Sequence, residues 1–177
     1  DDMQSNELAG TNSNRASFYY LMQYTTGTGF SGNAIWQSPY IVMGRANRII
    51  AAADGQLEDK NEAAKTIANY KSQALVLRAM ALFDMARIYG KTYTEDNGAS
   101  LGVPFTESVV SAADIATCQL PRLTVKENYE QVLKDLTAAI NSNALTEEKD
   151  QGYINVWAAK TLLARVYLTM GEWDKAL

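Results

Sequence analysis

The sequence predicts an all-α protein made of tetratricopeptide-like helical pairs, with a long loop inserted between two of its helices. Apolar residues recur every three or four positions over long stretches, which is the period of one face of an α-helix. Only three prolines and 11 glycines occur in the 177 residues, so long helices are possible. Small and aromatic residues near the C-terminus have the spacing of a tetratricopeptide helix pair, namely Ala164, Tyr167, Gly171, Trp173 and Ala176.

The first helix is predicted over residues 38–54. Ser38 is expected to cap its N-terminus, and Pro39 is expected to take the first helical position, where its missing N–H does no harm. The second helix is predicted over residues 58–89, with Gly90 at its end. Its expected buried stripe is Ala63, Ile67, Tyr70, Ala74, Leu77, Ala81, Met85 and Ile88, widened near the C-terminal end by Ala79, Phe83 and Ala86.

The third helix is predicted over residues 124–141, because Thr124 and Glu127 have the spacing of a capping box. The fourth is predicted over residues 155–170, with Gly171 at its C-terminal cap. A further helix starts after Gly171, and the sequence ends within it. We therefore expect one domain over residues 1–177 that is the N-terminal portion of a longer protein, with Tyr167 and Trp173 packed inside the last helix pair.

Two regions lack a helical pattern. Residues 1–37 are polar and then rich in aromatic side chains, and three glycines disfavour a helix between Tyr24 and Asn33. Residues 91–121 separate two helices and contain the sequence GVP at 102–104. Loops of this length are usually functional or disordered. They do not occur in a regular repeat array, whose turns between helices are short.

Composition excludes several classes of function. The chain has no histidine, which removes serine and cysteine hydrolase triads and the common zinc sites. A net charge of −4 argues against nucleic acid as a partner. Cys118 is the single cysteine, no run of about 18 apolar residues exists, and no phosphate-binding or EF-hand motif is present. These absences remove the commonest catalytic arrangements, and no bound metal or cofactor is expected.

Several segments, taken in order, resemble the helices of SusD/RagB-type nutrient-binding lipoproteins. RANRII at 45–50 resembles the family's R-A-N-x-I-I helix, and residues 72–90 resemble its A-x-x-L-R-A-x-x-Y-F-x-L-x-R-x-Y-G helix. Residues 102–104 match its G-V-P element. Residues 122–140 and 158–176 match its two following helices. Together these segments extend the resemblance over residues 38–177, whereas residues 1–37 carry no family motif.

The resemblance implies a lipid-anchored protein on the surface of the outer membrane. Such proteins cover TonB-dependent, SusC-like transporters and capture glycans or other nutrients for import. They are not enzymes. The family's lipidated cysteine is absent here, because Cys118 lies in the loop between helices, so any membrane attachment would depend on an anchor that this chain does not contain.

The resemblance does not identify ligand-binding residues, so these are predicted from the aromatic region. Trp36 and Tyr24 flank a glycine-rich stretch, and exposed aromatic faces stack on the apolar faces of sugar rings. Both are candidate ligand contacts, although packing beneath a loop is the commoner role for a residue such as Trp36. Asn47 and Arg78 are instead expected to hold helices together through hydrogen bonds and an ion pair. The alternative function is a tetratricopeptide-type scaffold for protein–protein interaction that binds a peptide on its concave face.

Overall fold

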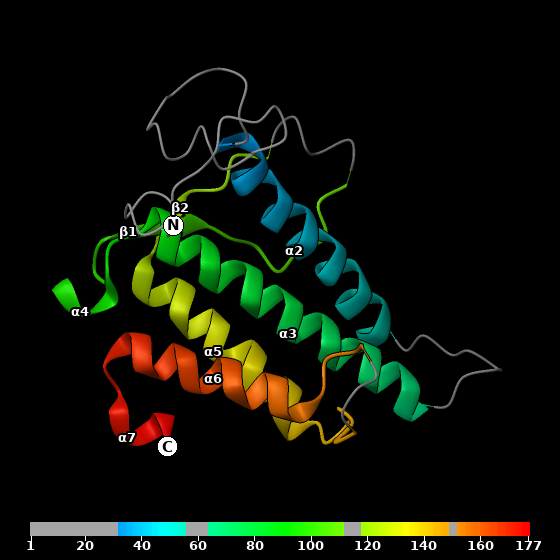
Figure 1. Ribbon diagram of the computed structural model, residues 1–177. Helices are drawn as coiled ribbons and strands as arrows, with labels where there is room; N and C mark the ends of the chain where they lie inside the picture. Colours follow the sequence, from blue (N-terminus) through cyan, green and yellow to red (C-terminus); the bar gives the residue numbers. More distant parts are fainter. Residues whose placement is uncertain (1–31, 56–63, 112–117, 149–151) are drawn as a thin grey trace, which may run out of the picture. The chain divides into compact units, whose positions relative to one another are not determined.

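A computed structural model describes residues 32–55, 64–111, 118–148 and 152–177 (Figure 1). The chain divides into two compact units, Asp1–Gln37 and Ser38–Leu177. Apart from residues 32–37, which begin the first described helix, the described helices and strands all belong to the second unit. None of the helices in the described ranges is long and apolar enough to cross a membrane.

The described part of the chain is mostly helical, which confirms the predicted all-α class. Its longer helices are α2 (Gly32–Asp54), α3 (Ala64–Tyr89), α5 (Val125–Asn141) and α6 (Val156–Met170), and its short ones are α4 (Tyr93–Asp96) and α7 (Trp173–Ala176). Helix α5 lies between α3 and α6, and the three run side by side (Figure 1). The tetratricopeptide-like pairing remains a prediction.

The core forms where α3 and α5 meet. Leu82 and Phe83 of α3 and Leu136 of α5 are fully buried. The Phe83 and Tyr129 rings meet edge to face, with centroids 5.5 Å apart and planes at 74°, which is a favourable arrangement for aromatic pairs. Burial of these side chains joins the two helices into one apolar layer.

The ends of α5 and α6 follow the predicted signals. The Thr124 hydroxyl accepts a hydrogen bond from the Glu127 amide at 3.1 Å, and the Glu127 carboxylate accepts one from the Thr124 amide at 2.7 Å. This is the reciprocal capping box that the sequence predicts. Asn155 caps α6 through the Ala158 amide, and Gly171 ends α6 at φ 78°, in the left-handed region that favours glycine.

Residues 91–121 contain regular structure that the sequence does not predict. Besides α4, the strand β1 (Leu101–Pro104) pairs antiparallel with β2 (Arg122–Thr124), with an irregularity between Leu101 and Pro104. The Arg122 guanidinium donates to the Gly102 carbonyl at 2.6 Å and to the Leu101 carbonyl at 3.0 Å. Long-range side-chain contacts therefore stabilise these short strands, and local sequence patterns do not reveal such contacts.

The predicted start of the first helix at Ser38 is wrong, because α2 begins at Gly32 and Pro39 lies inside it. A proline removes one backbone hydrogen bond from a helix interior, yet neighbouring turns can carry the helix through it. Gly32 and Asn33 are therefore helical, contrary to expectation. The rest of the predicted irregular region lies outside the described residues, as do residues 58–63 of the predicted second helix.

Two packing predictions also need correction. Tyr70, Leu77 and Ile88 of the expected α3 stripe are exposed, whereas the neighbouring stripe that includes Phe83 is fully buried. Because α3 is apolar on several sides, its spacing alone does not select the buried face. The predicted packing of Trp173 is wrong, since its side chain is 64% exposed. Helix α7, which contains Trp173, has four residues, and its contact with α6 leaves this side chain largely uncovered.

A pocket between helix α2 and the segment after strand β1

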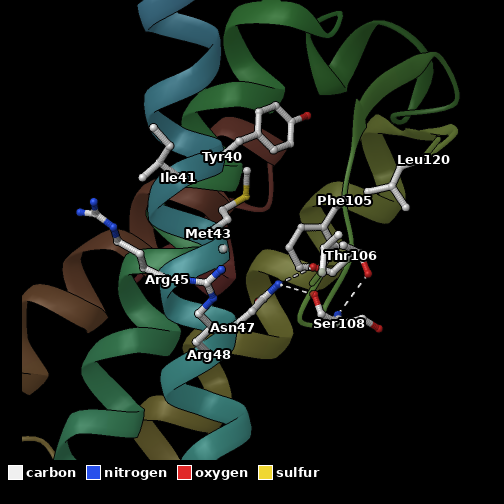
Figure 2. Close-up of a pocket in the computed structure, with 12 residues that line it drawn as sticks. Tyr40, Ile41, Met43, Arg45, Asn47, Arg48, Phe105, Thr106, Ser108 and Leu120 are labelled. Carbon is white, nitrogen blue, oxygen red and sulfur yellow. Dashed lines mark hydrogen bonds between the residues drawn. The ribbon is translucent and has the colours of Figure 1, made fainter. Parts of the chain in front are cut away.

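A pocket of about 370 Å³ lies between α2 and the segment that follows β1 (Figure 2). Its volume falls within the usual range of small-molecule sites, about 300–1,000 Å³. The apolar lining consists of Ile41, Met43, Phe105, Val110 and Leu120. The polar lining consists of Tyr40, Arg45, Asn47, Arg48, Thr106 and Ser108, and Gly44 leaves a gap on the helix face.

Asn47 connects the two sides of the pocket. Its side-chain amide donates to the carbonyl oxygens of Thr106, at 2.8 Å, and Ser108, at 3.3 Å. Its side-chain oxygen accepts a hydrogen bond from Arg78 Nη1 at 2.8 Å. Asn47 is buried, so each of these bonds replaces water that the folded protein excludes. Its predicted role as a hydrogen-bonding residue between helices is confirmed, and it also fixes the pocket wall.

A buried ion pair lies behind this contact. The Arg78 guanidinium donates two hydrogen bonds of 2.7 Å to the Asp135 carboxylate, one to each oxygen. The two residues are only 3% and 1% exposed. Burial raises the pKa of Asp135, although the hydrogen bonds and charge of Arg78 act in the opposite direction. The guanidinium also lies over the Phe105 ring, 5.7 Å from its centroid, so the pair supports an apolar part of the wall.

Glu107 is a third anchor of the pocket wall, because it binds residues of α5. Its carboxylate accepts hydrogen bonds from Lys134 Nζ at 2.9 and 3.0 Å, from Gln131 at 3.0 Å and from Arg78 at 3.3 Å. The hydrogen bond from Lys134 is the main reason why the pKa of Glu107 is lowered. Residues 106, 107 and 108 are thus held from α2, α3 and α5, so the pocket wall is ordered without a ligand.

Tyr40 forms the upper end of the pocket in Figure 2. Its hydroxyl donates to the Pro104 carbonyl at 2.9 Å. Burial raises the pKa of Tyr40 to about 12, so the phenol is neutral at physiological pH and keeps this donor. The hydrogen bond fixes the orientation of the ring against the end of β1.

Arg45 and Arg48 are the charged residues among those that line the pocket. Both are exposed, and no described residue forms a salt bridge with either. The acidic groups of the wall, Glu107 and Asp135, are already paired with Lys134 and Arg78. The described residues that line the pocket thus carry positive charge, on a chain whose net charge is −4. Across the described ranges, no three His, Cys, Asp or Glu side chains are grouped as metal ligands would be.

The Glu107 anchor predicts a pH-dependent stability. Its folded pKa lies below its ordinary value of 4.5, so the ionised carboxylate stabilises the folded state above about pH 4.5, and this contribution is lost as the pH falls through the folded pKa. Glu107→Gln should lower the free energy of unfolding at pH 7 by less than about 1 kcal/mol, because the carboxylate is half-exposed. Urea unfolding at pH 7 and pH 3 measures this, and an equal difference at both values would contradict it.

The structure describes one of the two predicted ligand residues. Trp36 is on α2 and is 36% exposed, but it belongs to the first compact unit and is not among the residues that line the pocket. Tyr24 lies outside the described residues. The reasoning from sequence missed Gly44, Arg45 and Arg48 as a group, because Arg45 and Arg48 lie in the RANRII segment, whose predicted role is structural. The available signal was the pair of arginines beside a glycine in an otherwise apolar helix.

Comparison with known proteins shows a match to the SusD-like family. A family model for SusD-like proteins, described as starch-binding and associating with the outer membrane, matches residues 1–168. A SusD-like protein of Bacteroides ovatus is 32% identical over 141 residues, which are 78% of this chain and 22% of that protein.

Two solved structures resemble the fold closely. A SusD superfamily protein of Bacteroides thetaiotaomicron has a TM-score of 0.78 and 36% identity, over 96% of this chain and 35% of the other. A putative sugar-binding protein of Bacteroides vulgatus also has a TM-score of 0.78, with 35% identity, over 94% of this chain and 35% of the other. The chain spans about a third of these structures and about a fifth of the Bacteroides ovatus protein.

Proposed function

Because this chain belongs to the SusD-like family of starch-binding proteins that associate with the outer membrane, we propose that it captures glycans or related nutrients at the cell surface. The match of the family model over residues 1–168 carries this proposal. The similarity to a putative sugar-binding protein supports it. The pocket beside α2 is a preformed concave surface of suitable size, and part of its wall comes from the long loop that is predicted to be functional.

The proposal includes a location and a partner. The protein is lipid-anchored at the surface of the outer membrane and passes its ligand to a TonB-dependent, SusC-like transporter. Affinity purification of the tagged protein from its native outer membrane, followed by mass spectrometry, tests the partnership. Recovery of such a transporter supports the proposal. Binding of peptides alone, with no transporter recovered, would favour the tetratricopeptide scaffold instead.

Trp36 and Tyr24 remain proposed sugar contacts of the first unit. Trp36→Ala should weaken the binding of a glycan found on an array by about tenfold, because an aromatic ring stacked on a sugar face contributes roughly that much. Trp157→Ala is the matched control, since Trp157 is 48% exposed on α6. Isothermal titration calorimetry measures both variants. Equal binding by the Trp36 variant and the unmodified protein would reject this site and leave the family assignment intact.

A further inference from the structure

Gly44 occupies the middle of α2, where a glycine destabilises a helix relative to alanine. Nothing in the described structure requires it, because a Cβ atom added to Gly44 would meet no atom within 4 Å. Its backbone dihedral is not in the left-handed region either. A glycine at such a position keeps the helix backbone open to a group that approaches it from outside. Gly44 lines the pocket, so that group would enter the pocket.

The residues on either side of this gap define what can enter. Tyr40, Gly44 and Arg48 are four residues apart and therefore lie along one face of α2. The face presents an aromatic ring, then bare backbone, then a guanidinium, over roughly 12 Å of helix. An aromatic ring suits the apolar face of a sugar, and a guanidinium suits a carboxylate through paired hydrogen bonds.

Charge selects between a neutral and an acidic ligand. Arg48 has no acidic partner among the described residues, whereas the Arg45 side chain points away from Phe105 and Ser108 in Figure 2. The carboxylate of Glu107 does not neutralise Arg48, because it is bonded to Lys134, Gln131 and Arg78. A neutral sugar would leave Arg48 without an acidic partner among the described residues, whereas a carboxylate would pair with it beside a partly apolar pocket.

We propose that the pocket between α2 and residues 105–108 binds the uronate unit of an acidic oligosaccharide, with Arg48 holding the carboxylate and Gly44 admitting the sugar ring. This rests on the proposed function, since it names the class of glycan that the protein selects. The wall tied by Asn47, Arg78 and Glu107 supplies rigidity, so little ordering is required when the ligand binds.

The test is a binding assay on paired ligands. Oligosaccharides from pectin, alginate and glucuronoxylan are compared with their carboxyl-reduced counterparts, which keep the backbone and lose the charge. We expect at least one acidic oligosaccharide to bind about tenfold more tightly than its reduced form. Arg48→Gln should abolish that difference in affinity. Rising salt concentration should weaken the binding of the acidic oligosaccharide and leave that of its reduced form unchanged. Arg165→Gln, which removes an exposed arginine on α6, is the control and should leave the difference intact.

A second pair of variants tests the location. Gly44→Phe should fill the pocket and eliminate binding of the acidic oligosaccharide. Gly44→Ala leaves most of the space, so it should retain binding and raise the melting temperature by about 2–4 °C. Melting curves also show whether the phenylalanine variant is folded. Unchanged binding by a folded Gly44→Phe variant would overturn the proposed location.

The remaining outcomes separate the two levels of the proposal. If neutral or carboxyl-reduced oligosaccharides bind as tightly as the acidic ones, the uronate inference fails while glycan capture stands. If no oligosaccharide of either kind binds to the folded protein, the proposed function fails and the inference fails with it.

Discussion

Replacing Asp135 with alanine is expected to lower the free energy of unfolding by about 3–5 kcal/mol, because it leaves the buried Arg78 guanidinium without its counter-charge. Arg78 is 3% exposed and makes two 2.7 Å hydrogen bonds to Asp135. Water cannot replace those bonds without opening the contact between α3 and α5. Urea unfolding followed by circular dichroism measures the change.

Asp84 offers the matched control for this variant. It lies on α3, its side chain is 49% exposed, and it faces Arg87 at 3.5 Å. Asp84→Ala should cost less than about 1 kcal/mol, since exposed ion pairs contribute little. The double variant Arg78→Met/Asp135→Leu should recover part of the loss, because it removes both buried charges but leaves the buried Asn47 oxygen without its donor. A loss for Asp135→Ala as small as that for Asp84→Ala would show that the buried pair contributes little to stability.

Gly102→Ala is expected to destabilise the protein by about 3 kcal/mol, through steric overlap and the loss of buried hydrogen bonds. A Cβ at this position would lie 2.1 Å from Asn128 Oδ1, which is much shorter than any van der Waals contact between carbon and oxygen. Asn128 is fully buried, accepts a hydrogen bond from the Val103 amide at 2.8 Å and donates one to the Val103 carbonyl at 3.0 Å. Moving the Asn128 side chain to relieve the overlap would break both bonds.

A double-mutant cycle checks this explanation. In an Asn128→Ala background the overlap is absent, so Gly102→Ala should cost much less there than in the unmodified protein. Gly44→Ala is the control, because the same substitution meets open space at that position. Equal costs for Gly102→Ala in both backgrounds would mean that Asn128 is not the obstacle.

Sequence reasoning succeeded where the controlling contacts are local. The Thr124 and Glu127 capping box spans four residues, and Gly171 ends α6 through its own backbone conformation, so both boundaries were predictable. The start of α2 was not, because Ser38 and Pro39 have the same appearance at the beginning of a helix and within one. Which face of α3 is buried was only partly predictable. Apolar residues lie on several sides of that helix, and neighbouring elements decide which of them are covered.

The candidate site was predictable only in outline. Loops as long as the one after α3 are usually functional or disordered, and Phe105, Thr106, Ser108, Val110 and Leu120 of this loop do line the pocket. The contacts that fix them join residues far apart in the chain, such as Asn47 with Thr106 and Lys134 with Glu107. No periodic pattern signals such pairs. The proposed sugar contacts Trp36 and Tyr24 remain a prediction based on residue type.

The amide of Asn128 has one more consequence, for association between molecules. A two-stranded sheet leaves a free strand edge, whose unpaired N–H and C=O groups can recruit a strand from another chain and start aggregation. At Val103 of β1 both of these groups already bond to the Asn128 side chain within the same molecule. A single asparagine thus takes the place that a foreign strand would occupy at Val103 of β1.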